Sequence, residues 1–341
     1  MTKKKIIALL LTFAIVFTFA ACAKKEPEPV AQEDKWPEDT MSIICVFKEG
    51  GAIDRVARNA ASCLEKSLGV SVIVENIGGA SGVLGTNEYF EKRAADGYTL
   101  YSTVQPGLSY IHSYMDCKYS VDDFAWINVQ EVDYLSIVVP ADSPFKTLQE
   151  LIDYAYAHPG ELTMGHVDPS GSSGFGALIF KDVMGLDVKP VHYESGGTLR
   201  VDVQAGVVDF IVSNAFADYS AFGDNGPRCL GYWADKELEG IWPGVGPVNE
   251  IIEPLYGKTL PVMGDSRLIG VNKAFKENYP ERFDKLVKAY QEAVLSDENK
   301  AVYKDLGLSS ILQVVSPDEA TAMIKEYDKL IERYGYVLEN Y

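Results

Sequence analysis

Clusters of glycine lie at the predicted strand-to-helix turns of this chain, and their spacing favours a binding site for an anion. The clusters are Gly50-Gly51, Gly78-Gly79 with Gly82, Gly171 with Gly174, and Gly196-Gly197. Glycine lets the backbone approach a ligand closely, and the helix N-terminus behind each turn offers unpaired N–H groups and a partial positive charge. Several such turns facing one cleft would hold an anion, although any one of them is also consistent with a tight turn.

The sequence comes close to two enzyme motifs but matches neither. Ala80-x-Gly82-x-x-Gly85 is one residue short of the dinucleotide-binding pattern. The run 170–174 is rich in serine but has no GxSxG elbow, so its hydroxyls are better interpreted as hydrogen-bond donors or helix caps. A secreted α/β enzyme that used Asp54, Asp168 or one of these hydroxyls would need a general base nearby, and the spacing suggests none.

We expect neither a metal nor a cofactor. The four histidines lie far apart in the sequence and have no metal-ligand spacing. Cys45, Cys63, Cys117 and Cys229 include no CxxC pair. They allow two disulfides in an oxidising compartment, but small core residues are the interpretation that we favour.

Strands and helices alternate along the chain and would place the glycine turns at one edge of a sheet. We expect strands at 42–47, 70–75, 98–104, 134–139, 162–165, 188–193, 207–212 and 268–271. Helices are expected between most of them, with a capping box at Thr147–Glu150 and long amphipathic helices at 282–295 and 317–334. Residues 105–132 are less regular. This alternation of strands and helices predicts an α/β fold of two lobes, each with a parallel sheet and helical crossovers.

The N-terminus has the pattern of a bacterial lipoprotein signal. Three lysines precede an apolar stretch from Ile6 to Ala20, and Ala20-Ala21 stands before Cys22. This predicts a signal peptide over 1–21, acylation of Cys22, and a protein tethered to the outer side of the cytoplasmic membrane or the cell surface. An uncleaved anchor is the alternative, but the stretch is short for a span of about 20 residues. Residues 22–40 are rich in proline and charge and read as a flexible tether.

The charge balance argues against nucleic-acid binding. The chain has 31 Lys and Arg against 49 Asp and Glu, a net charge of -18. Such a surface repels nucleic acid and anionic lipid. An anionic ligand would therefore have to be held by local donors, because long-range steering opposes its approach.

The run from Val46 to Thr103 resembles the tripartite tricarboxylate transporter receptors, the TctC/Bug family. The sequence here is VFKEGGAIDRVARNAASCLEKSLGVSVIVENIGGASGVLGTNEYFEKRAADGYTLYST. Further agreement comes from 143–151, from His158-Pro159-Gly160, and from Gly196-Gly197 followed by 206–209. The resemblance is good over Ile43 to Asp209 and loose in the C-terminal third.

The resemblance implies a receptor rather than an enzyme, with a two-lobed periplasmic-binding-protein-like (Venus-flytrap) fold. The expected division is 41–137 for the first part of lobe 1, 138–240 for lobe 2, and 241–341 for the return to lobe 1. The ligand would be a small organic carboxylate, such as a di- or tricarboxylate, held in a cleft between the lobes and delivered to a membrane permease. A monomer is expected. A secreted enzyme and a ligand sensor for a signalling partner remain alternatives.

The resemblance also implies which residues bind the ligand, mainly through backbone amides and hydroxyls. The positions are Phe47, Lys48, Gly50, Gly51, Ala52 and Asp54 in the first loop, Ser81 and Gly82 in the second, and Gly165, His166, Ser170, Ser172, Ser173, Tyr193 and Asn214 on the other lobe. Asp54 is expected to brace the first helix, because it would repel a carboxylate. Lys48 either reaches a distal group of the ligand or points into solvent, and His166 is expected at the rim.

Overall fold

The computed structural model describes residues 35–339, and residues 37–341 group into one compact unit. The predicted signal peptide, Cys22 and most of the predicted tether therefore lie outside the described residues. Within the part of the chain that is described, no helix is long and apolar enough to cross a membrane.

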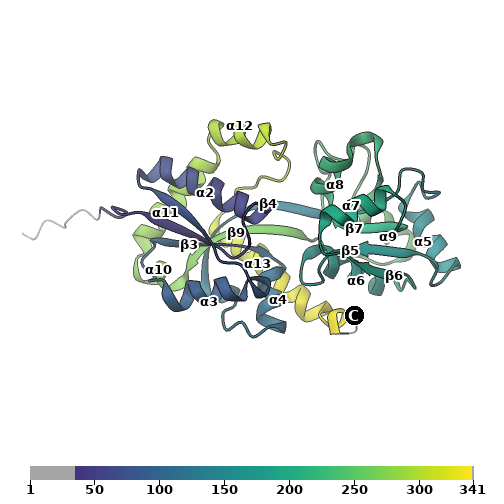
Figure 1. The fold of residues 1–341 in the computed structure, drawn as a ribbon, viewed down its shortest axis with the longest axis horizontal. Coiled ribbons are helices and arrows are strands. Elements are labelled where there is room, and N and C mark those ends of the chain that lie inside the picture. The colour runs from purple at the N-terminus through teal and green to yellow at the C-terminus, as the bar shows by residue number, and fades with distance from the viewer. Residues whose placement is uncertain (1–34, 340–341) are drawn as a thin grey trace, which may run out of the picture. The chain divides into compact units, whose positions relative to one another are not determined.

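A curled mixed sheet of nine strands runs through this unit (Figure 1). The strands lie in the order β2-β1-β3-β9-β4-β7-β5-β6, and β8 also pairs with β4. Their bounds are β1 Met41–Cys45, β2 Val72–Asn76, β3 Thr99–Gln105, β4 Phe124–Val139, β5 Thr163–His166, β6 Lys189–His192, β7 Phe210–Asn214, β8 Arg228–Tyr232 and β9 Gly264–Asn272. The outer pairs are parallel, whereas β4 and β9 run antiparallel to their neighbours.

The long strand β4 joins two halves of the sheet. Its residues Phe124 to Tyr134 pair with β9, while Leu135 to Val138 pair with β7. We call the half with β1, β2, β3 and β9 lobe 1 and the half with β5 to β8 lobe 2. The C-terminal ends of β3, β5 and β7 lie near this change of partner, since Gln105 is paired with Ser266 and Asn214 with Leu135.

Helices cover both faces of the sheet. They are α2 Ala52–Leu68, α3 Val83–Lys92, α4 Gly107–Tyr114, α5 Leu148–Ala157, α6 Ser172–Met184, α7 Gly196–Gln204, α8 Ala215–Phe222, α9 Val248–Tyr256, α10 Lys273–Asn278, α11 Pro280–Val294, α12 Asp297–Asp305, α13 Pro317–Tyr334 and α14 Tyr336–Glu339. Short 3-10 turns are η1 Ala80–Gly82, η2 Val121–Asp123 and η3 Gly223–Asn225. The predicted capping box at Thr147 and Glu150 opens α5 and is confirmed.

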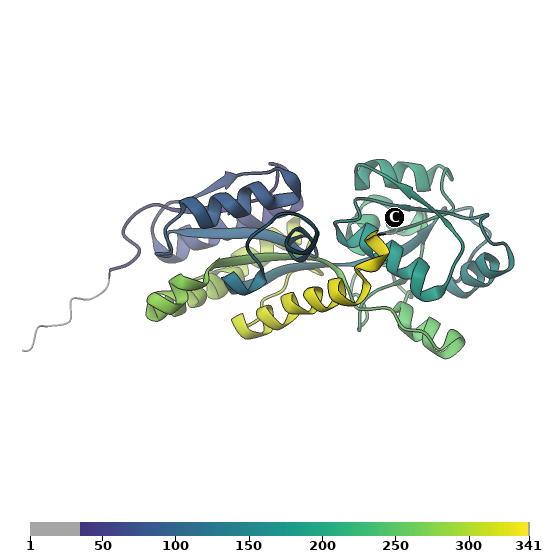
Figure 2. The ribbon, with the colours of Figure 1, turned by 90° about the horizontal axis from the view of Figure 1, so that it is seen from below.

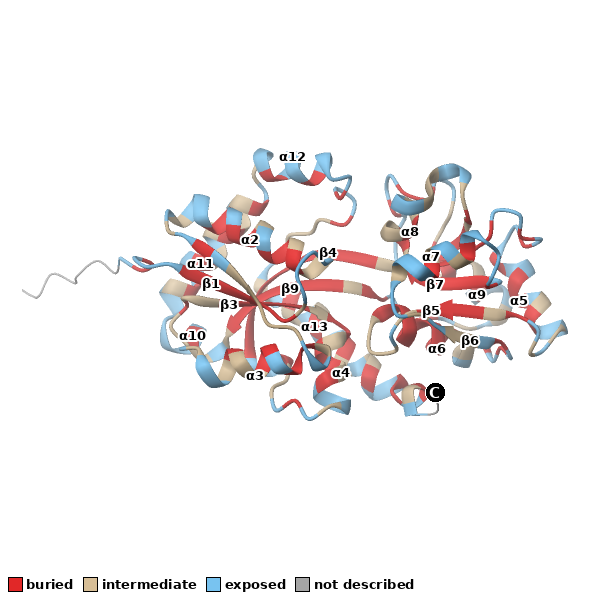
Figure 3. Cartoon of the chain, viewed as in Figure 1, coloured by how far each residue is buried: buried red, intermediate tan, exposed pale blue. Residues whose placement is uncertain are grey.

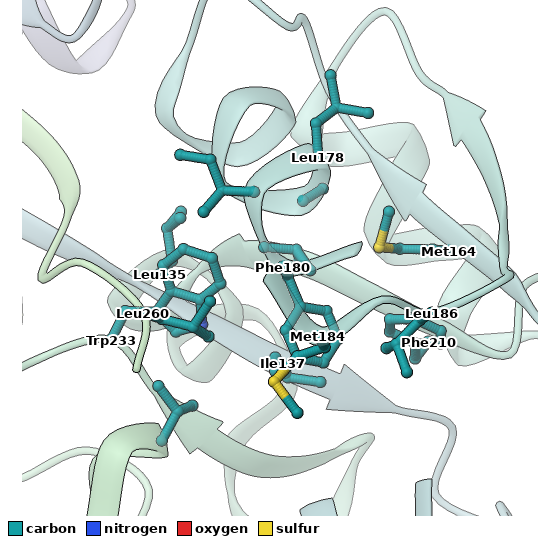
Figure 4. Packing of buried hydrophobic residues seen from close by; sticks show 14 of the residues in the cluster. Leu135, Ile137, Met164, Leu178, Phe180, Met184, Leu186, Phe210, Trp233 and Leu260 are labelled. Atoms are coloured by element: carbon teal, nitrogen blue, oxygen red, sulfur yellow. The ribbon is translucent and has the colours of Figure 1, made fainter. Parts of the chain in front are cut away.

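Buried apolar side chains form separate clusters on the two lobes, and buried segments are seen in both lobes in Figure 3. In lobe 1, Ile44, Tyr101 and Trp126 pack beneath α3, α4 and α13. In lobe 2, α6 packs on one face of the sheet, where Phe180, Phe210 and Trp233 meet (Figure 4). The C-terminal helix α13 runs along β4 towards lobe 2 (Figure 2) and adds Tyr327 and Ile331 to that cluster.

The fold class predicted from the sequence is confirmed, but the prediction of a parallel sheet in each lobe is wrong, because β4 and β9 run antiparallel to their neighbours in one continuous mixed sheet. The other main differences lie near the middle of the chain. The stretch expected to be irregular, 105–132, contains α4 and the first nine residues of β4. The prediction started this strand at Tyr134 because Asn128, Gln130, Glu131 and Asp133 break its apolar pattern, yet all four are buried. The strands and helices β8, α8, α9, α10 and α12 were not predicted.

The residue boundaries of the lobes stay a prediction. The expected division at 137 falls within β4, and α9 follows the expected return at 241. Val248 and Ile252 of α9 pack in the same cluster as Leu148 of α5. Cys45, Cys63, Cys117 and Cys229 are free and buried.

Candidate functional site

The first predicted loop, between β1 and α2, is held in shape by Asp54. Its side chain is buried and accepts hydrogen bonds from Gly50 N (2.9 Å), Arg58 Nε (3.0 Å) and Asn76 Nδ2 (2.9 Å). Burial opposes ionisation of this carboxyl, but the hydrogen bonds outweigh it and lower its pKa below the ordinary value. Asp54 therefore stays charged while it braces the turn. Phe47 is half-buried.

Lys48, Gly50 and Gly51 are exposed beside Phe47, and Ala52 is half-buried at the start of α2. Gly50 has a φ of 83°, a left-handed backbone that favours glycine. Lys48 lies against the second loop, since a Cβ on Gly78 would stand 3.4 Å from Lys48 N and 3.6 Å from its Cγ. The first two loops are thus in contact.

The second loop, between β2 and α3, has an unusual backbone. Gly79, Ala80, Ser81 and Gly82 all have positive φ, at 135°, 47°, 52° and 108°. Two successive non-glycine residues in this region carry strain, and such strain clusters at functional sites. Gly82 is buried and Ser81 is half-buried at the N-terminus of α3.

The predicted serines of lobe 2 are engaged with the protein itself. Ser173 Oγ donates to Val212 O at 2.6 Å, and Ser172 Oγ donates to Asp265 Oδ1 of β9 at 2.6 Å. Ser170 is half-buried in the turn before them, where its N–H donates to Asp168 Oδ1 at 2.8 Å. The side chains of Ser172 and Ser173 fasten the start of α6, so their hydroxyl protons are already committed.

His166 is not at the rim where it was expected, whereas the roles of Gly165 and Tyr193 stay predictions. His166 is fully buried rather than at the rim, with Nδ1 2.7 Å from Val167 O, and burial lowers its pKa. The ring of Tyr193 lies beside Gly165, where an added Cβ would stand 3.4 Å from Cε2. The hydroxyl of Tyr193 donates to Asp202 Oδ2 at 2.8 Å. The pKa of this hydroxyl is raised to about 12, mainly by burial and further by the Asp202 carboxylate.

Asn214 lies where the two lobes meet. Its Nδ2 donates to Asp133 O at 3.1 Å and to Ser172 Oγ at 3.4 Å. The backbone N–H of Phe216 donates to Asp133 Oδ1 at 2.9 Å. Together with the Ser172–Asp265 bond, these contacts fasten the loops of lobe 2 to β4 and β9.

A buried network of charges crosses this junction, and the sequence analysis missed it. Arg267 of β9 is 2.9 Å from Glu131, 3.6 Å from Asp265 and 3.9 Å from Asp133. Glu131 also accepts from Arg55 Nη2 of α2 at 2.6 Å and from Tyr303 OH at 2.9 Å. The signal was present in the run Gln130-Glu131-Val132-Asp133, where charges alternate with apolar residues in a strand.

Burial raises the pKa of Asp133 to about 7, and Arg267 acts against that rise. Asp133, at the point where β4 changes partner, therefore binds its proton more tightly than a solvent-exposed aspartate does. None of these charged groups was among the predicted site residues. We call Glu131, Asp133, Asp265 and Arg267 the junction cluster.

Several helices that follow a strand lack a side-chain cap at their N-terminus. The N-cap residues of α2, α3, α6 and α8 are Gly51, Gly82, Gly171 and Asn214, and none makes a side-chain cap bond. By contrast, α5, α10, α12 and α13 are capped by Thr147, Asn272, Ser296 and Ser316. At α7, Ser195 caps Thr198 N. The first-turn N–H groups of α2, α3 and α6 are therefore suited to bind an anion, whereas that of Phe216 in α8 already donates to Asp133 Oδ1.

A separate cavity of about 540 Å³ lies between α2 and the α11–α12 corner. Its lining includes Arg55, Asn59, Val302 and Tyr303, and none of the predicted site residues. Among residues 35–339, no group of three or more His, Cys, Asp or Glu side chains is arranged to hold a metal ion.

The chain belongs to the tripartite tricarboxylate transporter family receptors, whose family model matches residues 56–263. This is a class of solute-binding receptors, not enzymes, and it makes the chain an extracytoplasmic solute-binding protein. A Cupriavidus necator protein described as a UPF0065 protein in the gbd 5' region is 29% identical over 313 residues, which cover 82% of this chain and 91% of that protein. The protein BugT of Bordetella pertussis is 32% identical over 187 residues, 53% of this chain and 56% of BugT.

Solved structures share the fold. A TctC solute-binding protein from Polaromonas has a TM-score of 0.76 at 18% identity, covering 90% of this chain and all of that one. An R. palustris protein solved with adipate has a TM-score of 0.70 at 20% identity. The match covers 89% of this chain and 98% of that protein. MatC from Rhodopseudomonas palustris, solved with bound malate, has a TM-score of 0.67 at 20% identity. The match covers 89% of this chain and 99% of MatC.

Proposed function

We propose that this receptor captures a small organic carboxylate where its two lobes meet. The observation that carries the proposal is the set of N-termini of α2, α3 and α6 at the strand ends, whose N-cap residues make no side-chain cap bond. A carboxylate that leaves water needs replacement donors, because burying an unpaired charge costs several kcal/mol. Charge-assisted hydrogen bonds contribute roughly 1.5–3 kcal/mol each, so a few converging N–H groups suffice.

The binding loops in this proposal are those predicted from the sequence. Loop one contributes backbone N–H groups around Gly50, Gly51 and Ala52, and loop two contributes those at Ser81 and Gly82. On lobe 2 the proposed ligand-binding groups are Asn214 and the backbone at Ser170–Ser173. The side chains of Asp54, Ser173 and Tyr193 act by holding these loops, since their polar atoms bond to the protein.

The malate and adipate bound by two fold neighbours support a carboxylate as the ligand class. In this proposal the receptor delivers its ligand to a membrane permease, works as a monomer, and is anchored by a lipid on Cys22. Mass spectrometry of the mature protein would then find an N-terminus at Cys22 that carries the added mass of a lipid. A mature N-terminus without this added mass would contradict the anchor without affecting the binding site.

A thermal-shift screen of mono-, di- and tricarboxylates, amino acids and aromatic acids tests the ligand class. A ligand at 100 times its dissociation constant adds about 2.7 kcal/mol to the free energy of unfolding. We expect a rise in Tm with one narrow group of carboxylates, each recovered unchanged. A rise only with non-acidic compounds would contradict the proposal, and chemical conversion of a compound would favour the enzyme alternative.

A further inference from the structure

Arg200 places a guanidinium group over the N-terminus of α7, at an edge of lobe 2 where strands end. A Cβ added to Gly196, the first residue of α7, would stand 2.9 Å from Arg200 Nη1 and 3.5 Å from both Cζ and Nη2. Lobe 2 therefore has a cation at the loop between β6 and α7, which also carries the predicted site residue Tyr193. The sequence analysis did not include this residue among its candidates.

A buried carboxylate fixes the orientation of Arg200. Arg200 Nε donates to Asp218 Oδ1 at 2.8 Å, and Asp218 is fully buried in the first turn of α8. The other oxygen of Asp218 accepts from Ser136 Oγ at 2.9 Å. Because the partner and the backbone hold it, the guanidinium is preorganised, which lowers the cost of binding a further anion.

Donors of Arg200 remain beyond this ion pair. A guanidinium has five N–H donors in a planar fork, and the bond from Nε uses one of them. The two terminal nitrogens lie at Gly196, and 19% of the side chain is exposed. A cation at the positive end of a helix is electrostatically unfavourable, and a ligand carboxylate placed there relieves that repulsion.

Other donors at the junction are already committed. Arg267 is buried among the carboxylates of Glu131, Asp133 and Asp265, and Arg55 is paired with Glu131 at 2.6 Å. The hydroxyls of Ser172 and Tyr193 also donate to carboxylates of the protein. Arg200 differs from Arg267 because a single partner takes one edge of a group that can bind two carboxylates, and it differs from Arg55 in position, because Arg55 lines the separate cavity beside α12.

We propose that Arg200 binds the second anionic group of the ligand, so that the receptor selects dicarboxylates over monocarboxylates of the same chain length. This inference rests on the proposed capture of a carboxylate. The first carboxylate binds to backbone N–H groups, which accept any acid. The fork of Arg200 adds charge-assisted, geometrically specific bonds only when a second carboxylate is present.

The test compares matched pairs of probes on the full chain by isothermal titration calorimetry. Adipate is paired with hexanoate, and malate with 3-hydroxybutyrate. Removing Arg200 alone would leave Asp218 buried and unpaired, so the informative variant is the double substitution Arg200→Gln with Asp218→Asn, which removes both charges and keeps a partner for Ser136. Lys189→Gln changes the net charge by one at an exposed residue of β6, at the end opposite the loops, and is the control.

We expect the unmodified chain and Lys189→Gln to bind one dicarboxylate at least tenfold more tightly than its monocarboxylate partner. A tenfold ratio corresponds to about 1.4 kcal/mol. In the double variant this ratio falls to about one, while affinity for the monocarboxylate is unchanged. An unchanged ratio would overturn the role of Arg200 and leave the proposed function intact. Failure of the unmodified chain to bind any acid in a wider panel would instead overturn the proposed function.

Discussion

Replacing Glu131 with glutamine should destabilise the protein, because this carboxylate joins three elements at the junction. It is fully buried and accepts from Arg55 Nη2 at 2.6 Å, Arg267 Nη1 at 2.9 Å and Tyr303 OH at 2.9 Å. Glutamine keeps one acceptor oxygen but removes the charge. It also points an NH₂ group towards donors that need an acceptor.

The size of the effect follows from the partners that remain. Removing one member of a buried ion pair costs about 3–5 kcal/mol. The loss is moderated because Arg55 is 35% exposed and is screened by solvent, and because Arg267 keeps Asp265 at 3.6 Å. We therefore expect Glu131→Gln to lower the free energy of unfolding by about 3 kcal/mol, or Tm by about 6 °C.

Urea unfolding measures this change directly, with the midpoint and the m-value fitted together. Glu298→Gln is the matched control, since Glu298 pairs with Lys66 at 2.7 Å but both side chains are exposed. We expect the control to unfold at the midpoint of the unmodified protein. Equal midpoints for the two variants would refute the idea that the buried ion pairs of Glu131 stabilise the fold.

Three further substitutions test other parts of the account. Asp133 has a pKa of about 7 in the folded protein, above its unfolded value of 3.8, so its contribution to stability is complete below about pH 4 and is lost as the pH rises through 7. Relative to Asp133→Asn, the unmodified protein should lose up to about 1.4 kcal/mol per pH unit between pH 5 and 7. Gly85→Ala should cost about 2 kcal/mol or more in urea unfolding, because its Cβ would stand 2.4 Å from Ile77 O. Asp54→Ala should lower stability by about 1–3 kcal/mol and weaken carboxylate binding, because it frees three donors that shape loop one.

For each of these three substitutions, one result would contradict the expectation. Parallel pH profiles for the unmodified protein and Asp133→Asn would show that this carboxyl is ionised throughout. Gly107→Ala is the control for Gly85→Ala, since its Cβ meets only Val104 Cγ1 at 3.6 Å, and equal effects would argue against tight packing of α3 on β1. Carboxylate affinity that survives in Asp54→Ala would remove loop one from the site.

The alternation of strands and helices could be predicted because each element carries its own pattern. The strand Met41–Cys45 is apolar, and α2 repeats its buried residues at helical spacing before Gly69, which has a φ of 74°. Strand β4 could not be predicted in full, because its buried polar residues acquire partners only from distant segments. Asn128, for example, bonds to Gln313 O and accepts from Val315 N.

The candidate site was predicted in part. The glycine turns identify helix N-termini, since the turn chemistry is local to each segment. The direction of a side chain is not local, and this explains why His166 is buried and why Tyr193 turns to Asp202. Arg200 and Asp218 are 18 residues apart on two helices, and nothing in their own segments predicts that they pair.

The central claim is that backbone N–H groups and Arg200 recognise the negative charge of a small carboxylate. Calorimetric titration of the full chain with the tightest-binding acid of the screen, and with its uncharged amide, tests this most directly. The account predicts saturable binding of the acid at one site per chain and at least tenfold weaker binding of the amide. Equal affinities for acid and amide would contradict it.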